Sequence, residues 1–120
     1  MNLNKTAVVI LNWNGAKLLQ QFLPSVIQYS GNASIYVADN ASTDSSIAVL
    51  KNEFPTVKII ENTGNFGFAK GYNEALKFVE EPYYALVNSD IEVTENWLQP
   101  IEAIFDNEPK TAIIQPKLLD

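Results

Sequence analysis

Short runs of β-branched, apolar residues alternate along this chain with amphipathic stretches, and this alternation constrains the fold more than any other feature of the sequence. The first run, TAVVIL at residues 6–11, is continuous, which is typical of a strand buried on both faces of a parallel sheet. Similar runs recur at residues 34–39, 57–60, 83–88 and 112–116. Strands that alternate with helices imply right-handed crossovers. We therefore predict a Rossmann-like α/β fold, with a mostly parallel sheet and helices on both faces.

Amphipathic stretches between these runs predict the helices. Residues 18–27 place their apolar side chains on one helical face, and Pro24 is expected either to kink this helix or to shift its start. Ser42 or Thr43 is expected to be the N-cap of the second helix. The helices expected further along the chain carry residues 47–54, 68–79 and 94–105.

The composition is that of a globular, single-domain protein. The 120 residues, 47% of them hydrophobic, fit one domain over residues 1–120. No apolar run approaches the roughly 20 residues of a membrane span, so we predict no transmembrane segment. The absence of cysteine fits a reducing compartment and predicts a cytoplasmic location. A net charge of −6 argues against a nucleic-acid partner, because proteins that bind phosphate backbones normally carry a basic face.

Asparagine or aspartate stands at the end of each of the first four predicted strands. The ends read Asn12-Trp13-Asn14, Asp39-Asn40, Asn62-Thr63-Gly64-Asn65 and Asn88-Ser89-Asp90. In an open α/β sheet these ends lie along one rim, and the ligand binds there, where the strand order reverses. Turn preference explains any single end, since Asn, Asp and Gly favour turns. Four polar ends together favour a binding site. The four ends carry amides and carboxylates but no Arg, His or Cys, which suits a ligand such as a sugar or a nucleoside. A metal ion could then bridge the phosphates of that ligand.

Four strings of residues carry a resemblance to a known family. They are ILNWNG, VADNASTDSS, ENTGNFGFAKGYNEAL and LVNSDIEV, in that order, within a match that runs from about Thr6 to Gln115. This arrangement resembles the nucleotide-binding half of glycosyltransferase family 2, particularly its rhamnosyltransferase-like members. The resemblance implies a GT-A fold and inverting transfer of a sugar, hexosyl or rhamnosyl, from a nucleoside diphosphate sugar to a saccharide or lipid-linked acceptor.

The resemblance also implies roles for single residues. Asp39 matches the family aspartate that hydrogen-bonds the donor nucleoside, usually at a base N–H, which implies a UDP- or dTDP-linked donor. A loop-capping role is the alternative for Asp39, although Asp44 at the helix start is the better candidate for that role. Asn88-Ser89-Asp90 matches the family's Asp-x-Asp element in the relaxed form Asn-x-Asp, so Asp90 is expected to hold Mn²⁺ or Mg²⁺ against the diphosphate. Because Asn88 replaces an acid, weaker metal binding is expected. Glu92 is predicted to be a solvated acid.

The loop GNFGFAKGYN at residues 64–73 matches a further element of the family. Its glycines permit close backbone approach, and the helix that begins here presents free N–H groups to a base or diphosphate. The spacing of these glycines after the third strand excludes a dinucleotide fingerprint. Lys70 can meet phosphate or stay solvated like most surface lysines, and Phe66 and Phe68 are expected in the core. The predicted donor nucleotide-binding residues are Asn12, Asn14, Asp39, Asn40, Asn65, Gly67, Lys70, Asn73 and Asn88, with Asp90 for the metal.

Inverting transfer also needs a general base to take the proton of the acceptor hydroxyl. In the family this carboxylate lies well beyond the Asp-x-Asp element, so we expect it beyond Asp120, in a longer enzyme that can lie against a membrane surface. These 120 residues are then a donor-binding half that is inactive by itself. The alternative is a receiver-like or nucleotide-sensing α/β module, although the third strand here ends in Glu61-Asn62 and not in the aspartate that receiver domains phosphorylate.

Overall fold

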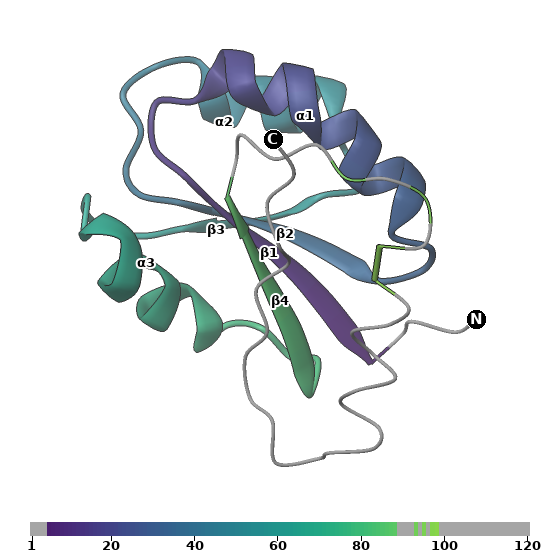
Figure 1. The fold of residues 1–120 in the computed structure, drawn as a ribbon. Helices are drawn as coiled ribbons and strands as arrows, with labels where there is room; N and C mark the ends of the chain where they lie inside the picture. The colour runs from purple at the N-terminus through teal and green to yellow at the C-terminus, as the bar shows by residue number, and fades with distance from the viewer. Residues whose placement is uncertain (1–4, 89–92, 94, 96, 99–120) are drawn as a thin grey trace.

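The computed structural model describes residues 5–88, 93, 95, 97 and 98. Within them the chain alternates between strands and helices, as predicted (Figure 1). The elements, in chain order, are β1 (Thr6–Asn12), α1 (Ala16–Tyr29), β2 (Ser34–Asp39), α2 (Ser46–Glu53), β3 (Lys58–Glu61), α3 (Gly67–Leu76) and β4 (Tyr83–Asn88). The helix predicted after Thr94 and the strand predicted at residues 112–116 lie outside the described residues, except for isolated positions such as Leu98, which is buried in the core.

The four strands of the described residues are all parallel and lie in the order β3-β2-β1-β4. The predicted parallel, Rossmann-like sheet is therefore confirmed. This order matches the first part of the doubly wound 3-2-1-4-5-6 sheet and differs from the 2-1-3-4-5 order of receiver-type folds. The receiver-like alternative does not fit, because β3 pairs with β2 and not with β1.

Helices cover both faces of the sheet: α1 and α2 lie on one face and α3 on the other (Figure 1). Alternation along β1 produces the two cores, since Val8 and Ile10 pack under α1 and α2 while Ala7 and Val9 pack toward α3. A strand with two buried faces must be apolar at nearly every position, which is why the first run in the sequence is continuous. In the described part of the chain, every helix is too short or too polar to span a lipid bilayer.

Pro24 lies inside α1 and does not shift the start of that helix, which begins at Ala16. Its side chain is exposed, whereas Leu23 and Val26 on the other face are buried. A proline in a helix interior removes one backbone hydrogen bond. In the same turn the Ser25 hydroxyl donates to the carbonyl of Phe22 at 2.9 Å and so supplies a side-chain hydrogen bond to the backbone there.

The N-terminus of α2 differs from the prediction. The helix begins at Ser46, so neither Ser42 nor Thr43 is its N-cap. The N-cap position is held by Ser45, whose side chain makes no capping hydrogen bond. Asp44, one residue earlier, supplies the acceptor: one of its oxygens accepts a hydrogen bond from the N–H of Ser46 at 2.9 Å, and also from the Ser46 hydroxyl. Its other oxygen accepts from the N–H of Ala16, at the start of α1, at 3.2 Å. Asp44 therefore joins the N-termini of two helices, where a negative charge is favourable.

We predict that Asp44→Ala lowers the free energy of unfolding by about 1 kcal/mol at pH 7. Burial acts to raise the pKa of Asp44, but hydrogen bonds from Ser46 and Ala16 outweigh it, and the pKa lies below its ordinary value. Because the folded-state pKa is depressed, this stabilisation is present above the unfolded pKa of about 3.9 and is lost as the pH falls through the folded value. Urea unfolding of wild type and variant at pH 7 and pH 3 measures the effect.

Glu53→Ala is the matched control for this prediction. Glu53 is, like Asp44, an exposed acid that links the two helices, but it is the last residue of α2 and, among the described residues, accepts a hydrogen bond from the Gln20 side chain at 2.9 Å and from no helix N-terminus. Its removal should cost less at pH 7, because a single exposed polar contact contributes little and a negative charge is not favoured at a helix C-terminus. Equal losses in the two variants at pH 7, or a loss in Asp44→Ala that persists undiminished at pH 3, would show that Asp44 does not act as a charged cap.

Candidate functional site

The carboxyl ends of the four strands lie along one edge, which we call the strand-end rim: the last residues of β1 to β4 and the loops that follow them. In the register of the sheet, Asn12 pairs with Asp39, Asp39 pairs with Glu61, and Leu11 pairs with Asn88. The strand order reverses at β1, since β2 and β3 lie on one side of it and β4 on the other. Ligands of open α/β sheets bind at such a reversal. The rim therefore meets the geometric condition for a binding site.

Asn12, Asp39 and Ser42 form a buried polar cluster at the ends of β1 and β2. The Asn12 amide donates to Asp39 Oδ1 at 2.9 Å, and the Ser42 hydroxyl donates to the same oxygen at 2.7 Å. The backbone N–H of Ser42 donates to Asp39 Oδ2 at 2.8 Å. Asp39 is 2% exposed, so its carboxylate is held by three internal donors and has little contact with solvent.

Asn12 Oδ1 is buried and accepts no hydrogen bond within the described part of the chain. Rotation of the amide would not help, because the oxygen would then face the carboxylate of Asp39 in place of the N–H₂ group. The backbone of Gly15 passes close above it: a Cβ at that position would lie 2.6 Å from Asn12 Oδ1. Glycine at position 15 is therefore needed for the close approach of the loop to this side chain.

Asn14 joins the loop after β1 to the loop after β2. Its Oδ1 accepts from the backbone N–H of Thr43 at 2.7 Å and of Asp44 at 3.2 Å, and its own N–H donates to Ser42 Oγ at 2.8 Å. Asn14 takes a left-handed conformation with φ of 50°, which Asn tolerates better than most residues. The side chain is exposed, but its amide oxygen is engaged in these internal contacts.

A second buried network, on the other face of the sheet, attaches α3 to the rim. The Asn40 amide donates to the carbonyl of Gly67 at 3.1 Å. The Asn62 amide donates to Asn40 Oδ1 at 2.7 Å and to the carbonyl of Gly71 at 3.1 Å. A Cβ on Gly71 would lie 2.7 Å from the Asn40 amide nitrogen, so only glycine allows the helix to approach this closely. The predicted binder Asn40 thus has both of its polar atoms engaged inside the protein.

The loop before α3 and its first turns are exposed, in contrast to these networks. Asn65, Gly67, Lys70 and Asn73 all lie on the surface, and Gly67 has a φ of +76° that favours glycine. The Lys70 ammonium lies 4.8 Å from the centre of the Phe66 ring, a cation–π distance.

The expectation that Phe66 and Phe68 belong to the core is wrong for Phe68. Phe68 is 52% exposed and touches Tyr72 edge-on, with ring centres 5.0 Å apart, while Phe66 is half-buried. Phe68 lies in the first turn of α3, at the rim. Apolar periodicity therefore identified the helix correctly but not the point at which its side chains reach solvent.

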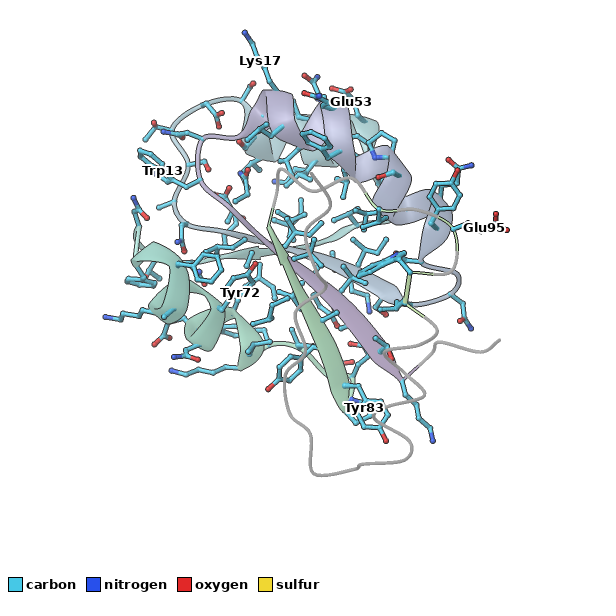
Figure 2. The ribbon with its side chains drawn as sticks, in the orientation of Figure 1. Trp13, Lys17, Glu53, Tyr72, Tyr83 and Glu95 are labelled. Atoms are coloured by element: carbon cyan, nitrogen blue, oxygen red, sulfur yellow. The ribbon has the colours of Figure 1, made fainter. Side chains whose placement is uncertain are left out.

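Tyr72 of α3 contacts β1, where the strand order reverses, and the neighbouring strand β4. Its hydroxyl donates to the carbonyl of Val87 in β4 at 2.8 Å and accepts from the N–H of Leu11 in β1 at 3.4 Å. Burial raises the pKa of Tyr72 to about 12, with the hydrogen bond from Leu11 acting in the opposite direction. The phenol is therefore a neutral structural contact at the place where β1 and β4 end (Figure 2).

Asn88 ends β4, and its backbone lies at the rim beside Leu11. Its side chain, Ser89, Asp90 and Glu92 fall outside the described residues, so the roles predicted for Asn88 and Asp90 stay predictions. Among the side chains that are described, no three His, Cys, Asp or Glu residues form a group able to hold a metal ion.

Two rim residues were not among the sequence candidates, Trp13 and Ser42. Trp13 is 55% exposed in the loop after β1, at the opposite end of the molecule from Tyr83 at the start of β4 (Figure 2). An aromatic residue between two asparagines at a strand end was the available signal for Trp13. Ser42 had no such signal, because its role depends on contacts with residues 28 and 30 positions away.

A hollow of about 480 Å³ lies along β3, apart from these candidates. Its lining includes Tyr36, Lys58 and Phe78, and none of the predicted site residues contributes to it. We therefore place the candidate site at the strand-end rim and not in this hollow.

Solved structures of glycosyltransferases resemble this fold. S. aureus TarS (1–349) in complex with UDP-GlcNAc matches with a TM-score of 0.73 and 23% identity, over 87% of this chain and 32% of that one. A mannosyltransferase from Pyrobaculum calidifontis, PcManGT, in complex with GDP-Man and Mn²⁺, matches with a TM-score of 0.66 and 21% identity, over 73% of this chain and 28% of that one. This chain thus spans less than a third of the length of either protein.

Comparison at the level of sequence identifies the family. No curated protein matches the chain. The model of the family "Glycosyl transferase family 2", in contrast, matches residues 7–117, which include every candidate residue and all of the helices and strands described above except Thr6, the first residue of β1. The parallel 3-2-1-4 sheet is the one expected for the nucleotide-binding part of such an enzyme. This chain belongs to glycosyl transferase family 2.

Proposed function

We propose that this family 2 domain binds a nucleoside diphosphate sugar at the strand-end rim and serves the inverting transfer of its sugar to a saccharide or lipid-linked acceptor. The observation that carries the proposal is the convergence of polar strand ends at the reversal of strand order. The UDP-GlcNAc and GDP-Man complexes of TarS and PcManGT support it, because both proteins share this fold. The rhamnosyl preference that the sequence resemblance implies stays a prediction.

The rim residues divide into two groups in this proposal. Asn12, Asn14 and Asn40 hold the loops in place, since most of their polar atoms already have internal partners. Asp39 contacts the nucleoside with the acceptor capacity that its internal donors leave free. The exposed residues after β3 then offer surface for the ligand, namely Asn65, Gly67, Lys70 and Asn73. Trp13 adds an exposed indole suited to stack against a base or sugar ring.

We further propose that Asp90 holds a divalent cation, Mn²⁺ or Mg²⁺, with Asn88 as a neutral second ligand. Asp39 does not fit this role, because its oxygens already accept three hydrogen bonds from N–H and O–H groups. In the sequence, Asp90 comes two residues after Asn88, the last residue of β4, and is the first acid after that strand. When bound, the cation would neutralise the negative charge of the departing diphosphate.

The first test of this proposal is titration of the isotopically labelled 120-residue chain with UDP and dTDP in the presence of Mg²⁺, followed by NMR. We expect amide shifts to concentrate at the rim, at Trp13, Asn14 and Ser42, because the ligand contacts these loops. Lys58 and Phe78, which line the hollow along β3, serve as internal controls and should not shift. Absence of any response at millimolar nucleotide, or shifts centred on the hollow, would argue against a donor site at the rim.

A second test concerns Asp90 and the cation. We predict that Asp90→Asn makes the affinity for UDP in Mn²⁺ equal to that in EDTA while leaving uridine binding nearly unchanged. The amide keeps the size of the side chain but removes the charge that a hard cation needs, and uridine has no diphosphate for the cation to bridge. Calorimetric titrations with UDP and uridine measure both affinities.

Glu92→Gln is the matched control, since it removes one negative charge two residues away. It should retain the metal-dependent part of UDP affinity. If Glu92→Gln has the same effect as Asp90→Asn, the loss reflects net charge and not ligation by Asp90. If wild-type UDP affinity is indifferent to EDTA, the cation is not needed for binding.

A further inference from the structure

We propose that Asn12 and Ser42 determine the base specificity of the donor site. By occupying one oxygen of Asp39, they leave the carboxylate a single free acceptor, which selects uracil or thymine diphosphates over guanine diphosphates. This inference rests on the function proposed above, in which Asp39 contacts the nucleoside.

The count of hydrogen bonds at Asp39 is the first step. A carboxylate offers about four acceptor positions, two on each oxygen. Oδ1 accepts from the Asn12 amide at 2.9 Å and from the Ser42 hydroxyl at 2.7 Å, so both of its positions are filled. Within the described part of the chain, Oδ2 accepts one hydrogen bond, from the Ser42 backbone N–H at 2.8 Å. One position on Oδ2 therefore remains for a ligand.

The surrounding loops fix this arrangement. The Ser42 hydroxyl has one proton, and its oxygen accepts from the backbone N–H of Asn14 at 2.8 Å, so the proton is directed to Asp39. The Asn12 amide cannot turn without placing its oxygen against the carboxylate. Both donors to Oδ1 are thus held by contacts that do not depend on a ligand.

The edges of the bases differ in the number of donors they present. Uracil and thymine carry one ring N–H, at N3, between two carbonyl groups. Guanine carries two adjacent donors, N1–H and the 2-amino group, which fit both oxygens of a free carboxylate. At Asp39 the second guanine donor finds Oδ1 already filled. Only a base with a single N–H on that edge has all its donors satisfied.

Burial makes the mismatch costly. Asp39 is 2% exposed and Asn12 is 1% exposed, so water cannot readily reach an amino group left unpaired beside the carboxylate. A buried donor without an acceptor loses its hydration and gains nothing in return. We expect the penalty to weaken binding by about tenfold or more.

The test compares UDP, GDP and inosine diphosphate (IDP) by calorimetric titration against the 120-residue chain. Hypoxanthine has the size of guanine and keeps N1–H but lacks the 2-amino group. We expect IDP to bind about tenfold more tightly than GDP, and UDP also to bind more tightly than GDP. Exclusion of purines by size alone would make IDP and GDP equally weak, and that result, or tighter binding of GDP, would overturn the inference.

Ser42→Ala tests the role of the serine directly. The variant frees one acceptor position on Oδ1, so the ratio of GDP affinity to UDP affinity should rise several-fold. Ser45→Ala is the matched control: it is the same substitution in the same loop, at an exposed residue whose side chain makes no capping hydrogen bond. If a folded Ser42→Ala protein has the same ratio of GDP to UDP affinity as the wild type, Ser42 does not determine the base specificity.

The outcomes also separate this inference from the function on which it rests. If UDP, IDP and GDP bind with equal affinity, the result supports a donor site at the rim but contradicts the proposed base specificity. Absence of binding by all three overturns both. If Ser42→Ala does not fold, the comparison of IDP with GDP affinity in the wild type still tests the base specificity, because it needs no substitution.

Discussion

The burial of polar side chains at the ends of β1 and β2 is the constraint on which the rest of the rim depends. The parallel register sets Asn12 directly beside Asp39, and both are almost fully buried. Buried polar atoms that lack partners cost free energy, so the loops must supply donors to the carboxylate. Ser42 supplies two of them and thereby fixes the path of the loop after β2. The strand-end rim is thus built on a requirement of folding.

Asp39 and Asn40 connect this requirement to both layers of the domain. Successive residues at a strand end point to opposite faces of the sheet. Asp39 accordingly joins the loops that lead into α1 and α2, while Asn40 joins Asn62 and the backbone of α3. Two adjacent residues therefore anchor, through their side chains, the loops that lead into α1 and α2 and the start of α3. A change at either one is expected to affect both the fold and ligand binding, which is why the tests above compare ligands and matched variants.

Much of the fold could be predicted from the sequence, because continuous apolar runs and helical periodicity are local signals. The position of the candidate site at the rim was predicted by applying the general rule for open α/β sheets to four polar strand ends. The division of those polar residues into framework and free surface could not be predicted, since contacts such as Asn14 with Thr43 join segments 29 positions apart. The expectation of Ser42 or Thr43 as the N-cap of α2 was wrong, and the exposure of Phe68 was missed, for a related reason. Each depends on how a helix end is placed against the sheet, which propensity does not encode.

Charge limits how such a rim can hold a diphosphate. These 120 residues contain no arginine and no histidine, and their net charge is −6. Lys70 is the one basic side chain in the loop before and within the start of α3, and its ammonium already lies over the Phe66 ring. A ligand with two phosphates therefore meets few positive groups of the protein itself. A bound cation and the N–H groups of helix N-termini are the remaining sources of positive potential, because both act without a basic side chain. This shortage of positive groups is why Asp90, the acid that follows β4 in the sequence, matters to the proposal. A cation held by Asp90 would compensate the negative charge of the diphosphate, for which the rim offers few basic side chains.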